Sequence, residues 1–176
     1  MKIMKKLYQL LVFILILPAL IGMSAGCRQD GTMGDIDRSQ VEVIFDDSVM
    51  VDEIRWELME AEDLGPSITN DYGASFQARE GKLIYISFAV ENMGEEIRQI
   101  FDMKVVDDKG NYYSVCNEAY GYFSAPAVCT VQDIIPGVRR EFNASFDVPL
   151  DSVDLLLEVT DLRIPAGEKK YIDLGI

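Results

Sequence analysis

Apolar and polar residues alternate along several short stretches of this chain. In residues 82–91 the even-numbered positions from Ile84 to Val90 carry Ile, Ile, Phe and Val, while the odd-numbered positions between them are mixed. A period of two with β-branched and aromatic side chains is typical of a strand with one face in a core. We therefore predict a strand over 82–91 whose even-numbered side chains are buried.

Two further stretches show the same period. Residues 101–106 alternate, turn residues follow at 107–110, and residues 111–114 are extended in character, so a hairpin with its tip near Lys109 is predicted. Residues 138–148 alternate again, and Pro149 is expected to end that strand. Its predicted inner residues are Val138, Phe142, Ala144, Phe146 and Val148, with Arg140 interrupting the face at its exposed end.

Four more strands are predicted over residues 41–45, 54–62, 155–162 and 170–174, and Trp56 and Leu58 give the second of these an apolar side. The sequence contains no convincing amphipathic helix. Short strands separated by turn signals favour an all-β domain over residues 41–176, an immunoglobulin-like antiparallel β-sandwich of about seven to nine strands.

The N-terminus has the three parts of a secretory signal. Lys2, Lys5 and Lys6 precede an apolar run over residues 10–21, and Ser24-Ala25-Gly26 stand directly before Cys27. The apolar run is shorter than the roughly 20 residues of a spanning helix, so a transmembrane anchor is the weaker alternative. Residues 1–26 are interpreted as the signal peptide.

The small residues before Cys27 resemble a bacterial lipobox. The resemblance implies cleavage before Cys27 and a diacylglyceryl group on its sulfur, with residues 27–40 as a flexible tether. Two or three acyl chains would hold the protein on a membrane. We expect it to be exported and anchored on the outer face of the cytoplasmic membrane, or in the periplasm or outer membrane of a two-membrane cell. The alternatives are an ordinary signal peptidase and a structural role for the Cys27 thiol.

Composition excludes several classes of chemistry. The 176 residues include no histidine, so the chain has no histidine-based catalytic triad and no histidine-ligated metal or haem. The net charge of −14 repels nucleic-acid phosphates, and no nucleic-acid partner is expected. No cofactor motif is present: the sequence lacks a phosphate-binding loop, a GxSxG elbow and a CxxC pair.

Acidic residues occur as adjacent pairs, among them Asp46-Asp47, Asp52-Glu53, Glu95-Glu96 and Asp107-Asp108. A glycosidase needs two carboxylates that face each other across a cleft, whereas adjacent residues on a strand or turn point apart. We interpret the pairs as solvated turns and strand edges. No metal ligands are assigned, although a cation bound by the acidic loops is an open alternative. The prediction is that this protein is not an enzyme.

The order of these segments resembles a known family. A strand ending in VENMG, then FDMKVVDDKGNYY, then IIPGVRREFNASFDVP and finally KKYIDLGI are similar to the telokin-like, immunoglobulin-like sandwich of domain-of-unknown-function family 4352. The matching positions are Asn92, Gly94, Asp107, Gly110, Tyr113, Pro136, Gly137, Phe146, Val148 and Pro149. The resemblance covers residues 48–176 and implies a fold and a cell-surface location, but no catalytic residues.

Lipidation of Cys27 would leave Cys116 and Cys129 as an even pair on the exported side of the membrane, where oxidation is permitted. A disulfide between them is predicted, with two buried thiols as the alternative.

Five aromatic residues lie between Tyr112 and Phe123. Interfaces concentrate such side chains, so Tyr120 and Tyr122, and then Tyr112, are candidate binding residues. The alternative is that these rings cover one end of the sandwich.

Three functions follow from the sequence. The favoured one is a non-catalytic surface lipoprotein whose sandwich binds a protein or an envelope component. The second is a structural or accessory spacer of a membrane complex. The third is an enzyme or a solute- or cation-binding protein, which would need a deep pocket with converging polar groups.

Overall fold

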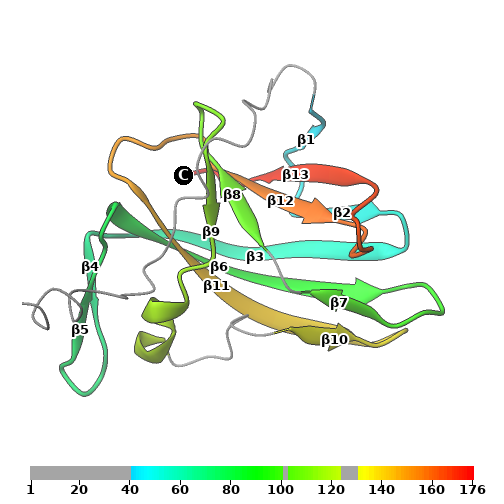
Figure 1. Ribbon diagram of the computed structural model, residues 1–176, viewed down its shortest axis with the longest axis horizontal. Coiled ribbons are helices and arrows are strands. Elements are labelled where there is room, and N and C mark those ends of the chain that lie inside the picture. Colours follow the sequence, from blue (N-terminus) through cyan, green and yellow to red (C-terminus); the bar gives the residue numbers. More distant parts are fainter. Residues whose placement is uncertain (1–40, 101–102, 124–130) are drawn as a thin grey trace, which may run out of the picture.

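A long strand, β6 (Gly81–Asn92), lies at the centre of the structure and is paired on both sides. It pairs antiparallel with β11 (Arg139–Pro149) on one side and with β3 (Ile54–Gly65) on the other. The even-numbered side chains of β6 from Ile84 to Val90 are buried, as their alternation predicts. The computed structural model describes residues 41–100, 103–123 and 131–176 (Figure 1).

Two sheets pack face to face around one core (Figure 1). The first has the order β11-β6-β3-β2, and the second has the order β1-β13-β12-β8-β9. The strands not yet given bounds are β1 (Val43–Ile44), β2 (Ser48–Val51), β8 (Lys104–Val106), β9 (Tyr112–Ser114), β12 (Leu156–Thr160) and β13 (Lys169–Asp173). The predicted all-β sandwich is confirmed.

An aromatic stack crosses the first sheet on its inner face. The rings of Trp56 and Phe88 lie 5.9 Å apart, and those of Phe88 and Phe142 lie 5.7 Å apart. The indole Nε1 of Trp56 donates a 2.9 Å hydrogen bond to the carbonyl of Thr160, on β12 of the second sheet. A buried indole needs such a partner, and this one joins the two sheets.

Short strands and one helical turn complete the fold. β4 (Ser67–Thr69) and β5 (Ser75–Gln77) form a hairpin, β7 (Arg98–Ile100) pairs with β10 (Gln132–Ile134), and the 3₁₀ helix η3 covers Asn117–Tyr122. The described residues thus contain thirteen strands, more than predicted. The extra strands, β2, β4, β5, β7 and β10, have three or four residues each, too few for alternation to be recognised.

Three details differ from the sequence prediction. β1 pairs with β13 in parallel, so the sandwich is not wholly antiparallel. Val138 is exposed rather than internal, because it lies in a turn that precedes β11. The amide of Val138 donates a 3.2 Å hydrogen bond to the carbonyl of Ile135 in this turn. The predicted strand from Phe101 begins outside the described residues, and β8 starts at Lys104.

The hairpin predicted near Lys109 is confirmed, since β8 and β9 pair antiparallel. Its turn is built on Asp107, which is buried, so the interpretation of the Asp107-Asp108 pair as solvated is wrong for its first member. Asp107 Oδ1 accepts hydrogen bonds from the backbone amides of Lys109 and Asn111. These bonds replace the water that the carboxylate loses on burial.

Candidate functional site

The β4–β5 hairpin and η3 lie together at one end of the sandwich (Figure 1). We name this region the aromatic end and define it by Tyr72, Phe76, Tyr85, Tyr120, Tyr122 and Phe123. Beneath it, Leu83, Cys116 and Ala119 form a small buried cluster separate from the main core. This cluster explains why Leu83 is buried although it lies on the outer face of β6.

The structure separates the aromatic residues singled out in the sequence. The ring of Tyr122 packs 5.5 Å from that of Phe76, and the ring of Phe123 packs 5.2 Å from that of Tyr85. Tyr120, in contrast, keeps 40% of its surface exposed. Of the pair Tyr120 and Tyr122, therefore, Tyr120 is the more accessible.

Tyr112 and Tyr113 point to opposite faces of β9. Tyr113 is buried in the main core. Tyr112 is half-buried on the outer face of the second sheet, with its hydroxyl 3.4 Å from that of Tyr171. Tyr112 thus belongs to a different cluster from Phe76, the residue on which Tyr122 packs.

Tyr72 is a surface aromatic that sequence reasoning missed. It lies at the tip of the β4–β5 hairpin and is 95% exposed. The tip is well ordered by hydrogen bonds: Asn70 Oδ1 accepts from the amides of Tyr72 at 3.1 Å and Ala74 at 2.9 Å, and Gly73 takes a φ of +79°. The sequence Asn70-Asp71-Tyr72-Gly73 is a turn signal that could have revealed this position.

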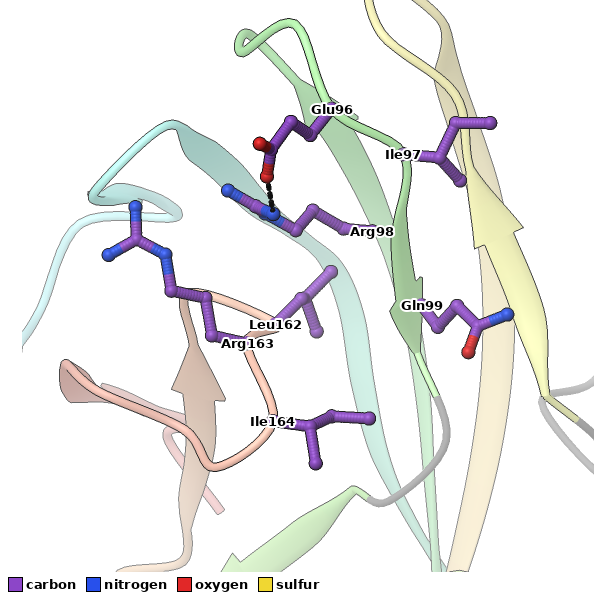
Figure 2. A pocket seen from close by; sticks show the side chains of 7 residues that line it. All are labelled: Glu96, Ile97, Arg98, Gln99, Leu162, Arg163 and Ile164. Carbon is purple, nitrogen blue, oxygen red and sulfur yellow. Dashed lines mark hydrogen bonds and ion pairs between the residues drawn. The ribbon is translucent and has the colours of Figure 1, made fainter.

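A groove of about 490 Å³ opens elsewhere, between β7 and the loop after β12 (Figure 2). It is lined by Glu96, Ile97, Arg98, Gln99, Leu162, Arg163 and Ile164. Figure 2 shows Leu162 and Ile164 extending from their loop toward β7, and Arg98 reaching from β7 toward Arg163. None of these residues is a candidate from the sequence, because the two halves are more than 60 positions apart.

The loop over residues 161–168 is held by the buried carboxylate of Asp161. It accepts hydrogen bonds from the amides of Arg163 at 3.2 Å, Gly167 at 3.1 Å and Glu168 at 3.4 Å. Burial alone would raise the pKa of Asp161, but these three bonds hold it below its ordinary value. Leu162 takes a φ of +56°, which is rare for a branched side chain.

The charged groups at the groove form a network. Arg98 pairs with Glu96 at 2.7 Å and lies 3.8 Å from Glu53, while Arg163 pairs with Asp52 at 2.6 Å. The turn between β2 and β3, which carries both Asp52 and Glu53, is thereby tied to the two sides of the groove. The groove thus combines apolar side chains with charged ones.

Several predicted positions lie outside the described residues: the signal peptide 1–26, the tether 27–40, Cys27 and Cys129. Cys116 is buried, but its predicted disulfide with Cys129 stays a prediction. Among the described residues, no three acidic or cysteine side chains converge as metal ligands would. No helix in that part of the chain has the length and hydropathy of a membrane span.

Solved structures similar to this chain are β-sandwiches of low sequence identity. The yjhA protein from Bacillus subtilis has a TM-score of 0.52 and 13% identity, over 74% of this chain and 99% of that one. An uncharacterised β-sandwich protein from Clostridium difficile has a TM-score of 0.45 and 12% identity, over 77% and 95%. A candidate lipoprotein from Bacillus subtilis, ycdA, has a TM-score of 0.48 and 16% identity, over 74% and 39%.

No protein-family model matches the chain, and no curated protein matches its sequence. The structural likeness to yjhA shows a shared fold alone. It supports the β-sandwich, but it does not extend to the telokin-like family that the sequence resembles.

Proposed function

We propose that this protein is an exported, non-catalytic lipoprotein whose β-sandwich binds another protein or an envelope component through the aromatic end. The lipid anchor on Cys27 is part of the proposal, and so is membership of the telokin-like family. The observation that carries the binding role is the exposure of Tyr72, at 95%, on a hydrogen-bonded turn. An exposed aromatic side chain on a turn whose backbone is already hydrogen-bonded is a ready anchor for a partner, because the turn needs little further backbone ordering on binding.

Tyr120 supports the same surface. It lies on η3, which contacts β5, and its neighbour Tyr122 is fixed against Phe76. The ion pair between Arg79 and Glu118, at 2.6 Å, adds a polar margin. A rigid aromatic centre with a polar margin is the usual composition of a protein-binding surface.

The test replaces Tyr72 and Tyr120 with Ser in the full-length protein and leaves Tyr122 unchanged, because its ring is packed. Partners would be cross-linked in native membranes, recovered and quantified by mass spectrometry. Leu150→Ser is the matched control, since Leu150 is 68% exposed but lies in the turn after β11. We expect the double variant to lose the partners that both the wild type and the control retain, with the melting temperature unchanged.

Retention of all partners by the double variant would show that the aromatic end is not the recognition surface. The runner-up function, a spacer in a membrane complex, predicts that result. It also predicts that a polar β-sandwich of similar length can replace this domain without loss of the complex.

A further inference from the structure

The groove of Figure 2 lies between two stretches of backbone. Residues 96–99 line one side without interruption, and residues 162–164 line the other. Side chains alternate along a strand, so a wall made by one strand face would contain only every second residue. Arg98 and Gln99 both line the groove and both belong to β7, yet Figure 2 shows their side chains pointing to opposite sides, so the backbone of β7 itself borders the groove.

One edge of β7 has no strand beside it within the described residues. β10 pairs with β7 through Ile134↔Arg98, Asp133↔Gln99 and Gln132↔Ile100, and these two strands make a sheet of their own. In the same part of the chain, no backbone hydrogen bond joins residues 96–99 to residues 162–164. An unpaired strand edge is a template for another extended segment.

The opposite wall offers apolar surface for such a segment. Ile164 is 73% exposed and extends toward β7, whereas Leu162 beside it is 8% exposed and belongs to the main core (Figure 2). The loop that carries them is fixed by the hydrogen bonds to Asp161, so this wall does not need to be ordered when a partner arrives.

Charge defines the partner further. Arg98 and Arg163 face the carboxylates of Asp52, Glu53, Glu96 and Asp161. Asp161 is buried, and the other five groups sum to two positive and three negative charges, a local excess of one negative charge, while the whole chain carries −14. A cationic segment is therefore the complementary occupant.

We propose that this groove binds an extended basic segment of a partner protein, which adds as a strand to the free edge of β7. In this arrangement, apolar side chains of the segment pack on Ile164, and alternate Lys or Arg side chains reach Glu96 and the carboxylates of the β2–β3 turn. This site is separate from the aromatic end.

The test uses the full-length protein in detergent and a fluorescent seven-residue peptide of alternating Val and Lys, blocked at both ends. Two further peptides share its length: one replaces Lys with Glu, and the other carries N-methyl groups on alternate backbone amides so that it cannot pair as a strand. Binding is followed by anisotropy at physiological ionic strength, where charges interact over only about 8 Å. Hydrogen exchange of residues 96–100 reports on the strand edge.

We expect the Val-Lys peptide to bind at least about tenfold more tightly than either of the other two peptides and to slow exchange in β7. Ile164→Ser should weaken binding by a similar factor without changing the melting temperature. Leu150→Ser, at an exposed apolar position outside the groove, should bind as the wild type does.

Equal binding of the N-methylated peptide would overturn the proposal, since the attraction would then be electrostatic only. An equal effect of Leu150→Ser, or no binding by a folded protein, would overturn it as well. Replacement of Tyr72 and Tyr120 should leave peptide binding unchanged, so the two binding proposals can fail separately.

Discussion

The hydroxyl of Tyr113 donates a 2.8 Å hydrogen bond to a carboxylate oxygen of Asp107, and both residues are buried. The same carboxylate accepts from the side-chain amide of Asn111 at 2.9 Å. Burial raises the pKa of Tyr113 to about 12, so its hydroxyl stays protonated and donates at neutral pH. The strand β9 is thereby fixed to the turn that precedes it.

Replacement of Tyr113 by Phe should destabilise the protein, because a buried carboxylate would lose one of its donors while the ring stays packed. The expected loss in the free energy of unfolding is about 1–3 kcal/mol, measured by urea denaturation. Tyr112→Phe is the matched control, since its hydroxyl is 3.4 Å from that of Tyr171 and should contribute less. Equal losses in the two variants would mean that the bond from Tyr113 to Asp107 contributes no more to stability than the contact between the hydroxyls of Tyr112 and Tyr171.

Stability should fall in acid. Burial tends to raise the pKa of Asp107, but the hydrogen bonds from Asn111 and Tyr113 outweigh it, and the pKa lies below its ordinary value of 3.8. The pKa of Asp161 is lowered in the same way. A carboxyl whose pKa is lower in the folded state stabilises the fold above its unfolded pKa, and this contribution is lost as pH falls through the folded value.

We therefore expect the free energy of unfolding to decrease from about pH 5 downward, measured by denaturant titration at several pH values. Asp161→Asn should reduce the slope of this decrease. Asp46→Asn, which removes an exposed carboxylate, serves as the control. A slope that is the same in the wild type and Asp161→Asn would contradict the assignment.

The predicted disulfide between Cys116 and Cys129 can be tested by thiol titration. Unfolded, unreduced mature protein should show no free thiol from these two residues. Closing a loop of about 14 residues should contribute roughly 3 kcal/mol, so reduction should lower the melting temperature. Two titratable thiols besides any at Cys27 would instead support the alternative of buried, unpaired cysteines.

Lipidation of Cys27 predicts a specific mass. Protein extracted from membranes should lack residues 1–26 and carry the mass of a diacylglyceryl group, with or without a third acyl chain. Cys27→Ser should move the protein out of the membrane fraction. A mature form with an unmodified Cys27 would show that an ordinary signal peptidase processes the chain.

The long strands of this fold are predictable, since β6 and β11 repeat their alternation enough times to identify the core face. The outer face of β11 is harder to predict. Ser145 and Asp147 are buried there, although the sequence pattern assigns them to the polar side. The reason is tertiary, because the amides of Arg79 and Glu80 bond the carboxylate of Asp147 at 2.7 and 3.1 Å. A distant segment covers this face, and no local pattern reveals it.

The two proposed binding surfaces are harder to predict for the same reason. The local density of aromatic residues in the sequence indicates Tyr120 as a candidate. The exposure of Tyr72 has no such signal, because it depends on a hairpin whose strands have three residues each. The groove depends on Arg98 and Arg163 meeting the β2–β3 turn, and only the folded chain brings them together. Ion pairs between such distant residues leave no periodic signal in a sequence.

The parallel pairing of β1 with β13 fixes the point at which the proposed membrane tether joins the domain. Val43 lies opposite Tyr171 and Ile44 opposite Ile172, so the chain enters the sandwich beside the start of β13. Figure 1 shows β1 at the upper right and the β4–β5 hairpin at the lower left. With Cys27 lipidated as proposed, the tether joins the domain at β1, away from the hairpin of Tyr72, and that hairpin is left free to meet molecules approaching from outside the cell.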